Sequence, residues 1–292
     1  MKLKTIFFSP TGGTERIARI ITEEIALKLG LSPEYINITS PGSREGDLVF
    51  SEDILIAVFP TYAGRLPNKI MPDIKRIVKS NGSSLAVAVS VFGNRSYGDA
   101  PRELALLLEE KGFKIAGMGA FVSEHAFSEK VGIGRPDNDD VRMIKEFADA
   151  LGEKLNGIGE QNATGDPSPG DTSLGGIGID FDHVELLPYY TPLKEDMTPA
   201  GFLKAKPVLD HEKCIGCGLC EKSCPVGSIE EVFDKGLGKR VYETTGICIK
   251  CQACIKICPE KARVFKDEDF LSHIRMLEEN YGDRCEKQFY IV

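Results

Sequence analysis

Eight of the nine cysteines follow one spacing rule, which constrains the fold more than any other feature of this chain. The first run reads C-x2-C-x2-C-x3-C-P and holds Cys214, Cys217, Cys220 and Cys224. The second run repeats that spacing with Cys248, Cys251, Cys254 and Cys258. A secreted disulfide framework is a short cysteine-rich chain, whereas the residues before 214 contain no cysteine. The pattern therefore indicates metal ligands.

Three thiolates separated by two residues each can surround one face of a 4Fe–4S cluster, and the fourth ligand then comes from the other run. Cluster 1 is expected to use Cys214, Cys217, Cys220 and Cys258. Cluster 2 is expected to use Cys248, Cys251, Cys254 and Cys224. The alternative is a pair of structural zinc sites, which leaves the third cysteines and both prolines unexplained. Cys285 lies outside the rule and reads as a buried or incidental thiol.

This stretch resembles a bacterial two-cluster ferredoxin. The resemblance implies a small α+β ferredoxin-like domain that carries single electrons.

The first 155 residues alternate short apolar runs with amphipathic stretches, which is typical of a parallel sheet covered on both faces. Strands are expected at residues 3–8, 35–38, 54–59, 85–91 and 115–122. Helices are expected at 14–29, 68–79, 100–111 and 139–155. Five strands in this length suit an α/β, flavodoxin-like doubly wound domain, whose ligands bind beyond the carboxyl ends of the strands.

A polar loop joins the first expected strand to the first helix. It reads SPTGGT, from Ser9 to Thr14. A triphosphate loop needs GxxxxGK[ST] and a dinucleotide loop needs GxGxxG, and neither is present. Hydroxyls and backbone N–H groups at a helix start can still hold a phosphate. The plain alternative is a polar turn with a threonine cap.

Residues 1–155 resemble a short-chain flavodoxin at this loop, which implies bound FMN. Under the resemblance, the phosphate is held by Ser9, Thr11, Gly12, Gly13 and Thr14. The loop after the third strand then contributes Thr61, Tyr62, Ala63 and Gly64. The loop after the fourth contributes Phe92, Gly93, Asn94, Arg95, Tyr97, Gly98 and Asp99.

Within those loops, Tyr62 and Tyr97 are the candidates for stacking on the flavin ring, and Phe92 reads as core. Gly64 sits where a flavodoxin peptide can flip toward the reduced flavin N5. The chain departs from common flavodoxins in lacking tryptophan and in placing Arg65 and Arg95 in these loops. A positive charge there favours the anionic reduced flavin, although each arginine could equally be a solvated loop charge. His125 is a further candidate near the flavin or at a domain contact, with a structural role as the alternative.

Between the two regions, residues 156–205 hold 2 Lys+Arg against 8 Asp+Glu and are rich in glycine and proline. The sequence thus predicts a flavodoxin-like domain at 1–155, an acidic linker at 156–205 and a ferredoxin-like domain with a helical tail at 206–292. No basic stripe suggests nucleic-acid binding, and no apolar run reaches the length of a membrane span. A cytoplasmic protein is the default expectation.

The whole chain resembles flavodoxin–ferredoxin fusions. The resemblance implies an electron-transfer protein that passes electrons between FMN and two 4Fe–4S clusters, and on to donor and acceptor redox proteins. An FMN-dependent reductase of a small molecule, fed through the clusters, is the alternative, and whether the chain is itself an enzyme stays open. A redox sensor that controls a partner is a third, weaker interpretation.

Overall fold

A six-stranded sheet forms the body of the molecule, in the order β12-β7-β6-β4-β1-β2. The structure is a computed structural model and describes residues 1–164 and 178–292. The five strands from the first part of the chain pair in parallel. They are β1 (Leu3–Phe7), β2 (Pro33–Asn37), β4 (Ile54–Pro60), β6 (Leu85–Phe92) and β7 (Lys114–Val122). Taken in chain order, these strands have the spatial order 2-1-3-4-5 of flavodoxin-like sheets, so the expected fold class is confirmed.

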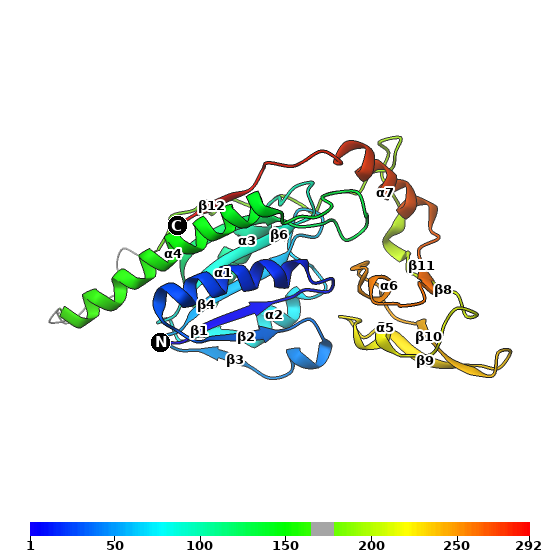
Figure 1. Ribbon diagram of the computed structural model, residues 1–292, viewed down its shortest axis with the longest axis horizontal. Helices are drawn as coiled ribbons and strands as arrows, with labels where there is room; N and C mark the ends of the chain where they lie inside the picture. Colours follow the sequence, from blue (N-terminus) through cyan, green and yellow to red (C-terminus); the bar gives the residue numbers. More distant parts are fainter. Residues whose placement is uncertain (165–177) are drawn as a thin grey trace.

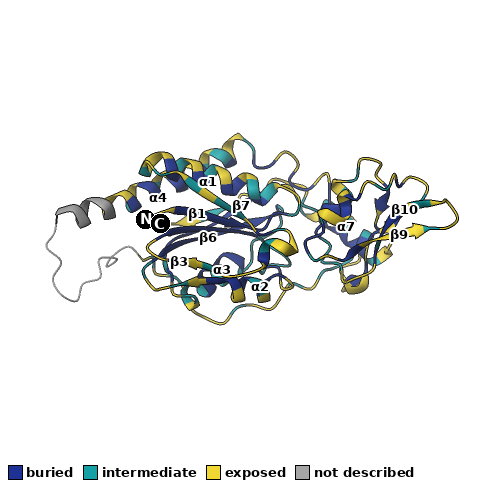
Figure 2. Ribbon diagram, turned by 90° about the horizontal axis from the view of Figure 1, so that it is seen from below, coloured by how far each residue is buried: buried dark blue, intermediate teal, exposed yellow. Residues whose placement is uncertain are grey.

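Helices cover both faces of this sheet (Figures 1 and 2). One face carries α1 (Gly13–Leu29) and α4 (Asn138–Thr164), and the other carries α2 (Met71–Ile77) and α3 (Ala100–Glu110). The strands are nearly continuous apolar runs because alternate side chains enter two separate cores. Ile56 and Val87 pack with α1 and α4, whereas Leu55 and Ala86 pack with α2 and α3.

Two helices end at other residues than the sequence predicts. The helix expected at 68–79 ends at Ile77, because Val78–Ser80 forms a short strand, β5, that pairs with β3 (Leu48–Phe50). The helix expected to stop at residue 155 continues as α4 to Thr164. No proline interrupts the backbone hydrogen bonds before Pro167. The helix therefore occupies the start of the predicted linker, and residues 165–177 of that linker lie outside the described part of the chain.

The cysteine-rich part forms a smaller body beside the carboxyl ends of the parallel strands (Figure 1). It holds two antiparallel strand pairs and two single-turn helices. The pairs are β8 (Val208–Leu209) with β11 (Arg263–Val264) and β9 (Ile229–Asp234) with β10 (Lys239–Thr244). The helices are α5 (Leu219–Lys222) and α6 (Ala253–Lys256), one within each cysteine run, and η2 (Phe202–Lys204) precedes them. The predicted helical tail is α7 (Glu268–Asn280).

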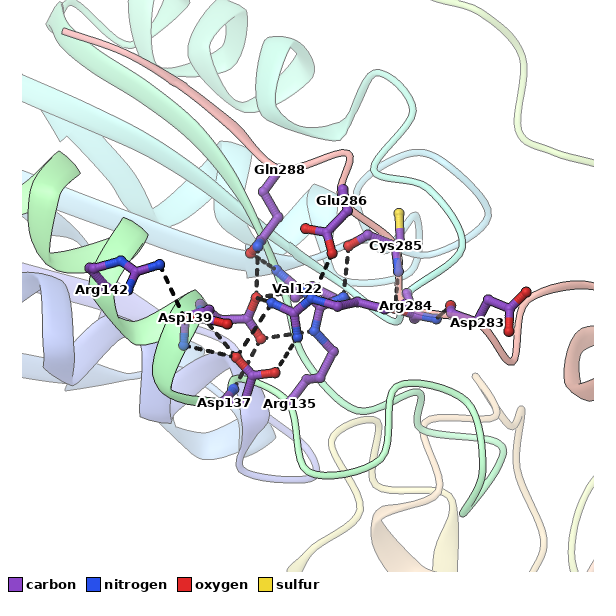
Figure 3. Close-up of polar contacts among 12 residues, drawn as sticks. Val122, Arg135, Asp137, Asp139, Arg142, Asp283, Arg284, Cys285, Glu286 and Gln288 are labelled. Atoms are coloured by element: carbon purple, nitrogen blue, oxygen red, sulfur yellow. Dashed lines mark hydrogen bonds and ion pairs between the residues drawn. The ribbon is translucent and has the colours of Figure 1, made fainter.

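The end of the chain returns to the large sheet, which the sequence did not predict. Strand β12 (Phe289–Ile291) pairs antiparallel with β7 and adds a sixth strand to the five expected. A charged network ties this tail down (Figure 3). At its centre, the fully buried Asp140 accepts hydrogen bonds from Arg135, Arg284 and Gln288. Residues 281–292 therefore join the small body to the flavodoxin-like one.

Within the described residues, no helix combines the length and apolar character needed to cross a membrane.

Candidate functional site

The loop between β1 and α1 opens into a cavity of about 400 Å³, which we call the large cavity. Pro10, Thr11, Gly13 and Thr14 line it. The Ser9 Oγ instead accepts a hydrogen bond from the Glu15 N–H at 2.9 Å, and Gly12 supplies a left-handed turn at φ 89°. Ser9 and Gly12 therefore shape the loop without lining the cavity.

Gly13 is required by close packing at the same place. A Cβ added to it would overlap the Ser123 Oγ. Gly13 and Thr14, the first two residues of α1, line the cavity, and the N–H groups at a helix start attract an anion such as a phosphate.

A tight turn after β4 forms the next wall. The Tyr62 and Arg65 backbones exchange hydrogen bonds at 2.8 and 3.1 Å around Ala63 (φ 52°) and Gly64 (φ 78°). The Thr61 Oγ1 is buried without a hydrogen-bond partner and belongs to a residue that lines the cavity. An orphaned hydroxyl at a cavity wall fits a site built for a polar ligand.

The carbonyl groups of this turn are already engaged. The Gly64 carbonyl accepts the Asp99 N–H at 2.8 Å, and the Ala63 carbonyl accepts the Tyr190 N–H at 2.8 Å. Any peptide flip at Gly64 would therefore have to break a backbone hydrogen bond.

Some residues of the loop after β6 line the cavity, and others make contacts elsewhere. Phe92, Gly93 and Arg95 line the cavity. Asn94 instead donates to the carbonyls of Tyr281 and Asp283 at 2.9 and 2.8 Å, which anchors the C-terminal tail.

The remaining predicted residues of that loop also lie elsewhere. The Tyr97 ring packs against Phe92 and Phe289, with ring centroids at 5.6 and 4.9 Å. Its position does not support the predicted stacking on a flavin ring. Gly98 allows the two loops to approach, since a Cβ there would overlap the Gly64 backbone. Asp99 accepts the Leu187 N–H at 2.6 Å and pairs with Arg102.

The two loop arginines have different surroundings. Arg65 forms a bidentate pair with Glu103 at 2.8 and 2.9 Å, so its charge is compensated. Arg95 stacks over the Tyr190 ring at 3.9 Å and lines the cavity. Only Arg95 therefore stands where it could act on a bound group.

Several lining residues come from segments that the sequence did not assign to the site. Tyr189, Tyr190 and Pro192 belong to the predicted linker, while Phe202 and His273 belong to the small body. The only sequence signal for the linker residues is the aromatic pair in LLPYYTPL, residues 186–193.

His125 is a half-buried residue of the cavity lining and is held neutral. Burial lowers its pKa to about 3, and the nearby His273 and Arg95 act in the same direction. Its Nδ1 accepts the Phe127 N–H at 3.1 Å, which places the proton on Nε2. A Cβ on Gly93 would lie 2.6 Å from the His125 Cδ2, so this contact explains why glycine stands at position 93.

The eight thiols line two small cavities in the smaller body. One is lined by Cys214, Cys217, Cys220 and Cys258. The other is lined by Cys224, Cys248, Cys251 and Cys254. This is the crossed grouping that the spacing predicted, with the fourth cysteine of each run in the other run's cavity.

Local backbone groups are arranged around these sulfurs. The N–H groups of Ser228, Lys250 and Ala262 donate to the sulfurs of Cys224, Cys248 and Cys258 at 3.2, 3.3 and 3.3 Å. Burial raises the pKa of Cys254 to about 11, so its thiolate requires a compensating positive charge such as iron. Among the described residues, no three His, Cys, Asp or Glu side chains converge on a point suited to a single metal ion.

The large cavity and the second thiol cavity share a wall. Residues 248–251, from Cys248 to Cys251, line both. Tyr62 faces this wall: burial first, and then Cys251 and Cys248, raise the pKa of its hydroxyl well above the usual range.

Comparisons with known proteins agree with the cysteine geometry. Family models described as "4Fe-4S binding domain" match residues 207–230 and 245–262. An uncharacterized ferredoxin of Methanocaldococcus jannaschii is 37% identical over 59 residues, which cover 20% of this chain and 75% of that one. The NAD(P)H-quinone oxidoreductase subunit I of Gloeobacter violaceus is 28% identical over 115 residues, which cover 37% of this chain and 55% of the subunit. The chain thus spans about half the length of that subunit.

A flavodoxin from the domain Archaea is similar to the first half. It covers 53% of this chain and 99% of its own, at 18% identity and a TM-score of 0.36. The fold assignment rests on the strand order described above. The chain therefore belongs to the ferredoxin family, as a fusion of a flavodoxin-like domain with a two-cluster 4Fe–4S region.

Proposed function

We propose that this chain is an electron-transfer protein in which FMN, bound in the large cavity, exchanges electrons with the two 4Fe–4S clusters. The observation that carries the proposal is the shared wall. A group in the large cavity and the cluster held by Cys224, Cys248, Cys251 and Cys254 would be separated only by residues 248–251.

The residues around the large cavity suit FMN at both of its ends. Backbone N–H groups at the start of α1, with Thr11 and Thr14, would hold the phosphate. Tyr62, Tyr190 and Arg95 also line the cavity and would receive the ring system. A cavity of about 400 Å³ is within the range of cofactor sites. Bound FMN would supply the ability to accept two electrons and release them singly.

The chain's own residues would keep this exchange internal. Phe202, Leu203 and the 248–251 segment from the small body line the cavity, together with Tyr190 and Pro192. A group bound there would therefore lie against the cluster-bearing body, which favours an electron carrier over a reductase of small molecules.

The first cysteine group would connect this internal exchange to partner proteins. The cavity with Cys214, Cys217, Cys220 and Cys258 shares no lining residue with the large cavity, and Cys217 is exposed. Electrons would therefore leave or enter at cluster 1, where donor and acceptor redox proteins dock. Reduced thiols in this number also suit the cytoplasm.

The first test is composition. Anaerobic purification should yield about eight iron and one FMN per chain, from one flavin and two cubanes. The absence of either cofactor would contradict the proposal.

The second test is transfer between the centres. After rapid partial reduction of the flavin, the clusters should be reduced at a rate independent of protein concentration, since the exchange is internal. Cys248→Ser should slow this transfer, whereas Cys285→Ser, a change to the thiol outside both groups, should not. Rapid, saturable reduction of a quinone, a nitro compound or NAD(P)⁺ would instead support the reductase.

A further inference from the structure

Arg263 is an arginine with the environment of a core residue. It begins β11, is 1% exposed and is among the largest fully buried side chains of the described chain. Its Nη1 donates to the Tyr242 carbonyl at 2.5 Å, and its Nη2 donates to the Thr244 Oγ1. Its Nε is buried without any hydrogen-bond partner.

No carboxylate compensates this charge. Across residues 1–164 and 178–292, no Asp or Glu oxygen lies within ion-pair distance of Arg263. A guanidinium stays protonated in proteins, and a buried, unpaired charge is strongly unfavourable. Such a residue needs a source of negative charge inside the fold.

The sulfurs of the two cysteine groups are the candidates for that source. Arg263 lines the cavity of the first group, and its Nη1 lies 3.9 Å from the Cys220 Sγ. It also donates to Thr244, a residue that lines the cavity of the second group. The guanidinium therefore lies beside the first set of thiolates and next to the lining of the second.

We infer that Arg263 is the internal counterion of both 4Fe–4S clusters and sets their reduction potentials. The inference rests on the proposed function, because it requires that both clusters be present. One-electron reduction adds one negative charge to a cluster and breaks no bond. A fixed cation beside the cluster sulfurs favours that added charge, since charge and hydrogen bonds near the sulfurs govern cluster potentials.

A purely structural role is the competing explanation. The hydrogen bonds to Tyr242 and Thr244 join β11 to β10, so loss of Arg263 would weaken the fold in either case. The two explanations differ in what lysine can do. Lysine keeps the charge but cannot reproduce the planar fork of donors.

The test is potentiometric titration of the full-length protein, followed by electron paramagnetic resonance, with iron content measured on each sample. Arg263→Met should make cluster reduction about tenfold less favourable, a shift of about 59 mV to more negative potential for one electron. Arg263→Lys should stay close to the unmodified protein. Arg240→Met is the matched control, because this arginine of β10 is 70% exposed and pairs with Glu231.

Unchanged potentials in Arg263→Met, with iron retained, would overturn the inference, as would equal shifts in the lysine and methionine variants. If the methionine variant does not retain iron, Arg263→Gln, which can still donate a hydrogen bond, replaces it in the comparison with lysine. If the unmodified protein lacks iron, the proposed function fails.

Discussion

Gly64 and Gly98 show how single residues shape the wall of the large cavity. Both have positive φ, at 78° and 53°, and they touch each other. At Gly64 the nearest atom to an added Cβ is 3.8 Å away, so only backbone strain opposes a side chain. At Gly98 the Cβ would enter the Gly64 peptide itself.

We expect Gly98→Ala to lower the free energy of unfolding by about 3 kcal/mol, through overlap and strain, and Gly64→Ala by about 1 kcal/mol, through strain alone. Urea unfolding of the two variants measures the difference. Equal losses of unfolding free energy in the two variants would show that the loops after β4 and β6 are not in contact at these glycines. The Gly64 carbonyl accepts the Asp99 N–H, so a flip of this peptide would break that hydrogen bond. If the peptide flips when the flavin is reduced, Gly64→Ala should also shift the one-electron flavin potentials.

His125 makes stability depend on pH. Its folded pKa of about 3 lies below the ordinary value of 6.5, so between these values the unfolded chain binds a proton that the folded chain does not. Stability should therefore fall as the pH drops below 6.5, by about 2 kcal/mol at pH 5. Burial also lowers the pKa of His273, which adds to the same trend.

Denaturant unfolding between pH 7.5 and 5 tests this. His125→Gln should flatten the dependence, whereas His183→Gln, at a side chain 60% exposed, should leave it unchanged. A pH dependence identical in His125→Gln and the unmodified protein would contradict a neutral His125 in the folded protein.

At the scale of elements, the segment around Tyr190 holds the turn after β4. Its N–H binds the Ala63 carbonyl, and its ring stacks on Arg95 at 3.9 Å. Tyr190→Ala should therefore release FMN about tenfold faster, since a stacked cation and aromatic ring contribute about 1 kcal/mol or more when desolvated. Stopped-flow dilution measures the release, and Val184→Ala, an exposed position in the same segment, is the control.

The C-terminal tail depends on a different contact. Asp140 compensates the buried Arg135 and also binds Arg284 and Gln288. Asp140→Asn should cost about 3–5 kcal/mol, because it leaves a buried arginine unpaired, and should expose residues 281–292 to proteases.

The neighbouring Asp139 is the matched control. It is 66% exposed, and its one ion pair within the described residues is with Arg142, three residues along the helix. Asp139→Asn should change stability by less than about 0.5 kcal/mol. Comparable losses of stability in Asp140→Asn and Asp139→Asn would show that the Asp140 network does not hold the tail in place.

At the scale of the molecule, the two bodies should respond differently to removal of iron. The flavodoxin-like body has two large apolar cores. The small body has smaller cores, and two of them include cysteines. One consists of Ile229 and Tyr242 with Cys220, Cys224 and Cys254, and another joins Leu209 and Val241 to Cys214. Iron binding is therefore expected to supply much of its folding free energy.

Chelation of iron should make amides of residues 206–265 exchange hydrogen rapidly while β1, β4 and β6 stay protected. Hydrogen exchange with mass spectrometry measures this directly. Simultaneous loss of protection in both bodies would show that they unfold as one unit.

The sequence by itself determined what repeats locally. Cysteine spacing was sufficient for the two ligand groups, because the chemistry of a cubane dictates it, and apolar periodicity was sufficient for the five parallel strands. It also located the phosphate loop, since a helix start needs no distant partner. Tertiary structure alone decided which loop residues face the cavity. Three predicted site residues instead contact segments far along the chain: Tyr97 packs on Phe289, Asn94 donates to the Tyr281 carbonyl, and Asp99 accepts the Leu187 N–H. The same holds for Tyr190, for the sixth strand and for Arg263: each depends on contacts between distant segments, whose energies no local pattern records.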